Sequence, residues 1–148
     1  MEKRFETFTT LIAKASRCVY KIKTGEMAEY NLKSSHVSCL YYLYKFDSLT
    51  AKELCDLCGE DKANISRAIK YLESEGYICC QTTMQKRYQS ALLLTEKGKA
   101  VGQEITKKID RILYEASEGL TEENRQIFYQ SLSLICQNLE KICIKYEE

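Results

Sequence analysis

The stretch from Leu49 to Gly98 constrains the fold of this chain more than any other part of the sequence. It contains two short segments with helical periodicity, separated by Gly59, and a second glycine, Gly76, follows the later segment. After Gly76 the apolar residues alternate with a period of two, which is the spacing of a β-strand. This order of helix, turn, helix and two-stranded hairpin predicts a winged helix-turn-helix.

Both helices of this stretch carry start and stop signals. Thr50 and Glu53 can form a capping box, because each side chain can bond to the backbone amide of the other residue. Gly59 can adopt the left-handed conformation that ends the first helix, and Asp61 is the expected cap of the second. The residues expected to face the core are Leu54 and Leu57 in the first helix and Ile65, Ala68, Ile69 and Leu72 in the second.

The hairpin is expected to begin at Tyr77. Ile78 and Cys80 share one face of its outgoing strand, and Leu92 and Leu94 share one face of its returning strand. The connecting residues 83–89 are polar and basic, and they form the tip of the wing.

Amphipathic helices are expected on both sides of this unit. One begins near Ser34 or Ser35 and ends near Lys45, and another runs from a cap at Thr95 to about Glu118. The N-terminal helix has an apolar face with alternating spacings of three and four, formed by Phe5, Phe8, Ile12, Ala15, Val19 and Ile22. The expected fold class is therefore mainly α with a small β-hairpin wing.

The last helix, which starts after Thr121, carries a coiled-coil-like seam. This stripe is longer than one small domain needs to bury, and it therefore predicts association with a second copy of the chain. Two-fold symmetry would then require a palindromic DNA site with half-sites about one helical turn apart. The seam residues are Phe128, Leu132, Ile135, Leu139, Ile142 and Tyr146.

Double-stranded DNA is the expected partner of the second helix. Its polar face carries residues suited to base edges, Arg67 for guanine and Asn64 for adenine, together with others suited to phosphates, Lys62, Ser66 and Lys70. The formal net charge is only +1, but residues 61–100 carry seven Lys and Arg against four Asp and Glu. Residues 101–148 carry six against nine, so the basic surplus lies in the proposed DNA-binding unit.

The chain resembles the MarR family of transcriptional regulators over essentially its full length. Four motifs carry the match in order: Leu49–Leu54, Asp61–Arg67, Leu72–Ile78 and Leu94–Lys99. The resemblance implies a repressor that acts as a homodimer and, in many members, responds to a small ligand or an oxidant. It also implies one MarR-like domain over residues 1–148, with dimerisation helices at 1–33 and 99–148 and a DNA-binding lobe at 34–98.

The wing tip departs from the family pattern. Family members usually carry an acidic residue beside one or two arginines at this place, where this chain has Lys86, Arg87 and Tyr88. A wing arginine normally enters the minor groove, so the resemblance implies that Arg87, with Lys86, contacts DNA.

Other classes of protein are less well supported by the sequence. The N-terminus lacks the apolar core of a signal peptide, and no apolar run is long enough for a membrane span, so a cytoplasmic protein without membrane contact is expected. A single histidine, without a phosphate loop or a spaced carboxylate pair, does not indicate an enzyme, and no cofactor is expected. A winged-helix module that binds another protein instead of DNA remains an alternative.

The eight cysteines are interpreted mainly as reduced, small apolar residues. Cys55 and Cys58 form a C-x-x-C pair, but Cys79 and Cys80 would face opposite sides of a strand, so we expect no metal site. A cysteine-based redox sensor is the other alternative. Cys18 is its candidate, because Arg17 and Lys21 flank it and peroxide-sensing family members use a cysteine of the N-terminal helix.

A small-molecule effector is a further candidate partner. In the family it would bind between the dimerisation helices and the DNA-binding lobe, and the candidate lining residues are Tyr20, His36, Tyr41 and Tyr44.

Overall fold

The computed structural model describes residues 3–81 and 89–147. The chain divides into two compact units, Met1–Ile109 and Asp110–Glu148. Among the described residues, no helix is both long enough and apolar enough to cross a membrane.

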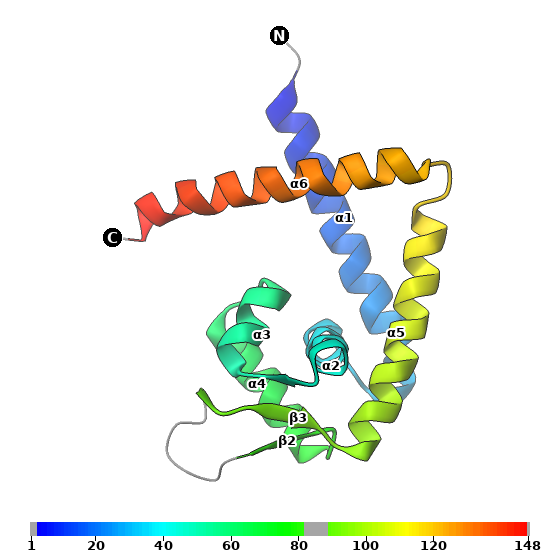
Figure 1. Cartoon of the computed structure of the whole chain (residues 1–148), viewed down its shortest axis with the longest axis vertical. Coiled ribbons are helices and arrows are strands. Elements are labelled where there is room, and N and C mark those ends of the chain that lie inside the picture. Colours follow the sequence, from blue (N-terminus) through cyan, green and yellow to red (C-terminus); the bar gives the residue numbers. More distant parts are fainter. Residues whose placement is uncertain (1–2, 82–88, 148) are drawn as a thin grey trace. The chain divides into compact units, whose positions relative to one another are not determined.

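The first unit contains most of the secondary structure (Figure 1). Its elements follow the order expected from the sequence, and they confirm a mainly helical fold with a small β-sheet wing. In chain order they are α1 (Arg4–Glu26), the 3₁₀ turn η1 (Ala28–Tyr30), α2 (Ser34–Phe46), β1 (Ser48–Leu49), α3 (Ala51–Cys58), α4 (Lys62–Ser74), β2 (Ile78–Cys80), β3 (Leu92–Leu94) and the first part of α5 (Glu96–Ala116).

The sheet has three antiparallel strands in the order β1-β3-β2. The β2–β3 hairpin expected from the alternation is confirmed, and it pairs Ile78 with Leu94 and Cys80 with Leu92. Strand β1, in which Leu49 pairs with Leu92, was not expected from the sequence. A two-residue strand is too short to show an alternating pattern, so periodicity alone could not reveal it.

Helix α2 lies at the centre of the first unit and packs against α1, α3, α4, β1 and β3. Its residues Val37, Leu40 and Leu43 are fully buried, as expected from a helix that is apolar nearly all round. The helix begins at Ser34, but its cap is Lys33 and not Ser34 or Ser35 as expected. The Lys33 amide donates to His36 Nδ1 at 3.0 Å, so this backbone N–H at the start of the helix has a hydrogen-bond partner.

The capping signals of α3 and α4 are confirmed. The Glu53 amide donates to Thr50 Oγ1 at 3.2 Å, and the Thr50 amide donates to Glu53 Oε2 at 2.7 Å. Gly59 ends α3 with φ of +63°, and the Asn64 amide donates to Asp61 Oδ1 at 2.7 Å. The prediction for Leu57 was wrong: this residue is 38% exposed, whereas Ala51 and Leu54 are the buried residues of α3.

The start of α5 is fixed against the turn that follows α4. Thr95 Oγ1 donates to the Gly76 carbonyl at 2.6 Å, and the Gly98 amide donates back to Thr95 Oγ1 at 3.1 Å. A Cβ atom on Gly98 would lie 2.0 Å from the Tyr77 carbonyl oxygen, so only glycine permits this close approach.

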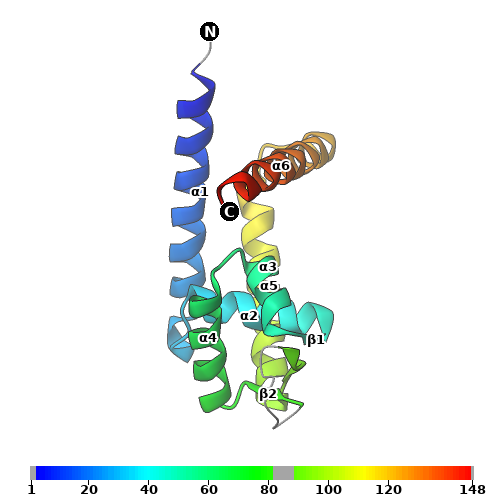
Figure 2. The same ribbon diagram turned by 90° about the vertical axis from the view of Figure 1, so that its left-hand side faces the viewer.

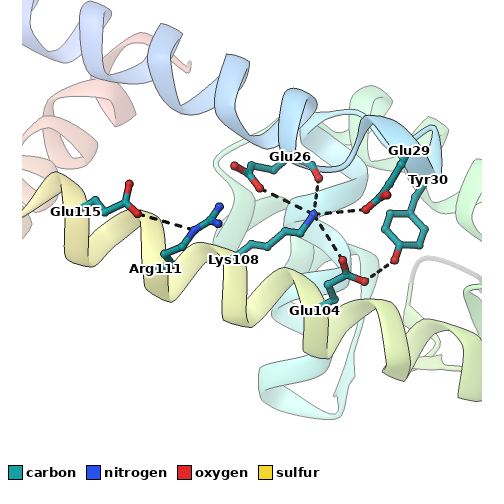
Figure 3. A network of polar contacts seen from close by, with 7 residues as sticks. All are labelled: Glu26, Glu29, Tyr30, Glu104, Lys108, Arg111 and Glu115. Carbon is teal, nitrogen blue, oxygen red and sulfur yellow. Dashed lines mark hydrogen bonds and ion pairs between the residues drawn. The ribbon is translucent and has the colours of Figure 1, made fainter.

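A polar network joins α5 to the end of α1 and to η1 (Figure 3). The Lys108 ammonium donates to the Glu26 carbonyl at 2.8 Å and lies 3.5 Å from a Glu104 carboxylate oxygen and 3.6 Å from one of Glu29. The Tyr30 hydroxyl donates to the other Glu104 oxygen. Its bond to this carboxylate, reinforced by burial, raises the pKa of Tyr30 to about 12.

The second unit contains the end of α5, α6 (Glu122–Cys143) and the 3₁₀ turn η3 (Ile144–Tyr146). Gly119 turns the chain with φ of +87°, and Thr121 caps α6 by accepting a bond from the Asn124 amide at 3.2 Å. None of the residues 122–143 is buried. The apolar seam of α6 is exposed in the single chain, with Phe128 at 53% and Leu139 at 45%.

We expect Lys108→Met to destabilise the first unit by about 1–2 kcal/mol, because it removes the cation from among three carboxylates and leaves the Glu26 carbonyl without its charged donor. Chemical denaturation followed by circular dichroism measures the effect. Lys107→Met is the matched control, since Lys107 is the exposed neighbour on the same helix. Equal midpoints for the two variants would contradict this role of Lys108.

Candidate nucleic-acid interface

Helix α4 presents a polar face because its apolar stripe is locked into the core. Ile65, Ala68 and Leu72 are buried against α2 and α3. Because these three residues fix the rotation of α4 about its axis, the positions on the opposite side of the helix face outward. Figure 2 shows α4 from the side, leading into β2 at its lower end. The five residues expected to contact DNA, Lys62, Asn64, Ser66, Arg67 and Lys70, are all exposed.

These five residues form two rows along the helix. Lys62, Ser66 and Lys70 follow one another at intervals of one turn, and they line a groove. Ala51 and two sheet residues, Cys80 and Leu92, line the same groove, together with Ile69 and Glu73 of α4. The phosphate-binding candidates are therefore gathered on the side of α4 that faces the wing.

Asn64 and Arg67 form the second row. The Arg67 guanidinium donates a hydrogen bond from Nη2 to Asn64 Oδ1. From the sequence, both residues were expected to contact base edges independently, but in this structure each is the other's partner. Since an arginine side chain loses conformational entropy when it binds, this bond pre-orients the guanidinium for a planar, two-bond contact.

The turn that leads into α4 is tied to α2 by its acidic residue. Ser35 Oγ donates to both carboxylate oxygens of Glu60, at 3.1 and 2.8 Å. This bond fixes the α3–α4 turn. It also explains why an acidic residue, Glu60, occurs beside the proposed DNA-binding face, where positive charge would be expected. The sequence offered no signal for it, because the two residues are 25 positions apart.

Lys97 fixes the base of the wing against the end of α4 and the start of β2. Lys97 donates to the Glu75 carbonyl at 2.7 Å, and its ammonium lies 4.3 Å from the centroid of the Tyr77 ring. The wing candidates Lys86 and Arg87 lie outside the described residues.

The four candidate ligand residues have different surroundings in the single chain. Tyr20 lines a shallow groove of α1 that also contains Lys23 and Ser34. His36 stacks on Tyr71, with ring centroids 4.3 Å apart. The two remaining candidates are Tyr41, which packs edge-on against Tyr42, and Tyr44, which covers Gly102 of α5.

His36 has a structural role that the sequence did not reveal. Its ring is partly buried between α2 and α4, and its Nδ1 accepts the Lys33 amide. Burial, together with the positive charge of Lys33, lowers the pKa of His36, and Glu60 opposes this shift. The neutral ring is therefore the form that the fold prefers.

The cysteine candidate Cys18 is exposed on α1, and all eight cysteines are free thiols. Within residues 3–81 and 89–147, no three His, Cys, Asp or Glu side chains are grouped so that they could hold a metal ion.

Comparison with known proteins identifies the same architecture. The model of the MarR family matches residues 30–79. Two uncharacterised HTH-type transcriptional regulators of Bacillus subtilis are similar in sequence: YwaE is 26% identical over 88% of this chain and 77% of its own length, and YybA is 25% identical over 88% and 87%.

Solved structures extend this similarity of fold over nearly the whole chain. NMB1585, a MarR family regulator from Neisseria meningitidis, has a TM-score of 0.83 and 20% identity over 99% of this chain and 100% of that chain. A putative MarR family transcriptional regulator from Listeria monocytogenes, complexed with a 26mer DNA, has a TM-score of 0.82 and 23% identity over 95% of each chain.

We expect the neutral state of His36 to make folding sensitive to acid. Above the pKa of His36 in the unfolded chain, about 6.5, the ring is neutral in both states, and its contribution to the free energy of unfolding is complete. As the pH falls toward the lower pKa of the folded state, the unfolded chain binds the proton first, and stability is lost. The wild type should therefore lose more free energy of unfolding than His36→Gln between about pH 7.5 and 5.5. Parallel losses in the two proteins, measured by urea denaturation, would rule out this contribution.

Proposed function

We propose that this chain is a DNA-binding transcriptional regulator of the MarR family, and that it is a homodimeric repressor that occupies a palindromic promoter site. The observation that carries this proposal is the polar face of α4, which is held outward by the burial of Ile65, Ala68 and Leu72. A helix presented in this way fits the major groove of B-DNA.

The two rows of polar residues on α4 have different roles in DNA binding, one contacting bases and the other contacting phosphates. Arg67, oriented by Asn64, reads a base edge, for which guanine is the best partner because it offers two acceptors. Lys62, Ser66 and Lys70, on the wing side, bind phosphates and set the position of the helix in the groove. Lys86 and Arg87 of the wing add contacts to the adjacent groove.

Two copies are needed for this surface to bind strongly. The surplus of positive charge within residues 61–100 is small, and each neutralised phosphate contributes one step to the salt-dependent part of the affinity. A dimer doubles the number of these contacts on one duplex. The Listeria monocytogenes protein with the same fold is described in complex with a 26mer DNA, a length that could accommodate two half-sites one helical turn apart.

The exposed seam of α6 supports dimerisation. Exposed apolar side chains in this number on one helix mark an interaction surface, because water contact with them is unfavourable. Helix α1 likewise exposes Leu11, Val19 and Tyr20. A second copy of the same chain covers both helices, with α1, α5 and α6 as dimerisation helices and residues 34–98 as the DNA-binding lobe.

We expect Arg67→Ala to remove the preference for the operator over a scrambled duplex, at a cost of about 1–3 kcal/mol, whereas Lys62→Ala weakens both duplexes equally and lowers the salt slope by about one. Fluorescence anisotropy with the region upstream of the protein's own gene measures both effects. Arg4→Ala, an exposed arginine on α1, is the matched control. The assignment fails if Arg67→Ala keeps its operator preference and Lys62→Ala keeps its slope.

We expect the wild type to sediment as a dimer at micromolar concentration. Leu139→Glu places a charge within the seam and should weaken association by about tenfold or more, because that charge would be buried without a partner. Gln137→Glu adds the same charge to the opposite face of α6 and should leave the dimer intact. A monomeric wild type, or equal dissociation constants for the two variants, would contradict the proposed interface.

A further inference from the structure

Asn64 and Arg67 form a side-chain pair on the exposed face of α4. Arg67 Nη2 donates a hydrogen bond to Asn64 Oδ1, and the two residues are three positions apart, so their side chains lie on the same side of the helix. Asn64 belongs to the first turn of α4, where its backbone amide donates to Asp61 Oδ1 at 2.7 Å. The first turns of a recognition helix are the part that reaches base edges, so this pair lies where a DNA sequence would be read.

The bond fixes which end of the Asn64 amide remains for DNA. A guanidinium group has only donors, so the amide atom that faces Arg67 must be the oxygen and cannot be the nitrogen. Oδ1 is therefore engaged within the protein, and the group that remains for a ligand is Nδ2, which has only N–H donors. A base donor that approached Oδ1 would also meet the positive charge of Arg67.

The acidic residues next to α4 in the chain do not neutralise this pair. Both carboxylate oxygens of Glu60 accept from Ser35 Oγ, at 3.1 and 2.8 Å, which directs this carboxylate toward α2. Asp61 Oδ1 accepts the Asn64 backbone amide instead of a guanidinium N–H. Asn64 and Arg67 together therefore present N–H donors and a positive charge to the surroundings of the helix.

We propose that Asn64 and Arg67 act as one unit that presents only donors, and that Asn64 thereby selects a keto base, guanine or thymine, beside the guanine bound by Arg67. In the major groove guanine offers O6 and N7 and thymine offers O4, and all of these atoms are acceptors. Adenine and cytosine place an amino group there, whose hydrogens would face the donors of the pair. The inference rests on the proposed DNA-binding function. It differs from the expectation for an isolated asparagine, whose amide pairs with adenine through both its oxygen and its nitrogen.

The pair makes the base preference of Asn64 depend on Arg67. When the Arg67 side chain is removed, Oδ1 becomes free to accept from adenine N6 while Nδ2 donates to adenine N7. Loss of Arg67 should therefore change the base that is preferred at a position that Arg67 itself does not contact. Two side chains that read their bases independently would not show this coupling.

The experiment selects binding sites for the full-length protein from duplexes with randomised half-sites, and fluorescence anisotropy then measures single-base variants of the selected site. Asn64→Asp identifies the position that Asn64 reads, because the carboxylate keeps an acceptor for Arg67 but has no donor. At this position the wild type should prefer a keto base over an amino base by about fivefold or more. Asn64→Asp should prefer cytosine, whose N4 donates to a carboxylate, and Arg67→Ala should shift the preference toward adenine.

Ser66→Ala is the matched control, because Ser66 is an exposed polar residue of the same helix in the row assigned to phosphates. This variant should weaken binding to all duplexes and leave the base preference unchanged. The inference is overturned if the wild type prefers adenine or cytosine at the position identified by Asn64→Asp. It is also overturned if no position responds to Asn64→Asp, or if Arg67→Ala leaves the preference at that position unchanged.

The pair is tested without DNA by nitrogen-15 NMR of the side-chain amides. The Asn64 signal, identified by its loss in Asn64→Asp, should shift in Arg67→Ala and stay in place in Lys70→Ala, which removes an exposed charge farther along the same helix. An Asn64 signal that does not respond to Arg67→Ala would remove the basis of the inference.

The outcomes separate this inference from the proposed function. If no duplex is enriched from the pool, the proposed function fails, and the inference fails with it. If sites are enriched and bound tightly but carry adenine at the Asn64 position, the proposed function stands and only the role of the pair is overturned.

Discussion

The burial of α2 is the constraint on which the rest of the first unit depends. Leu40 and Leu43 are inaccessible to solvent, and α1, α3, α4 and the sheet all pack around this helix. Because close-packed interiors tolerate few alternative arrangements, each surrounding helix has one face committed to α2. For α4 the committed face is that of Ile65 and Leu72, and its polar face follows from this. The proposed DNA-binding surface is thus a consequence of how the core is filled.

A second constraint fixes the wing relative to this core. The start of α5 approaches the Tyr77 carbonyl so closely that Gly98 cannot carry a side chain, and Thr95 closes the same junction with bonds to Gly76 and Tyr77. Lys97 covers the Tyr77 ring from the other side. These contacts explain in physical terms why a threonine, a lysine and a glycine occur together where β3 leads into α5. They hold the base of the hairpin beside α4, where the proposed phosphate-binding row lies.

Much of this arrangement could be predicted from the sequence because its causes are local. Capping bonds join residues three apart, so Thr50 and Asp61 marked the starts of α3 and α4 correctly, and periodicity identified the hairpin. The errors and omissions have non-local causes. Leu57 has the spacing of a core residue, but it is exposed, because the core covers the side of α3 that carries Leu54. The bond of Ser35 to Glu60 joins residues that are 25 positions apart, and no one-dimensional pattern contains it.

The turn between α3 and α4 is fixed both by local capping contacts and by a non-local bond to α2. Within residues 58–61 the chain ends one helix at a left-handed glycine, bonds to α2 through Glu60 and caps the next helix through Asp61. Such a short segment has little freedom to absorb a displacement, because its backbone conformation and its side-chain bonds are both fixed. A change in the distance between α2 and α3 must therefore alter either the capping bond or the direction of α4. This mechanical link requires no long pathway through the protein, because Ser35 of α2 holds Glu60 directly before Asp61, the cap of α4.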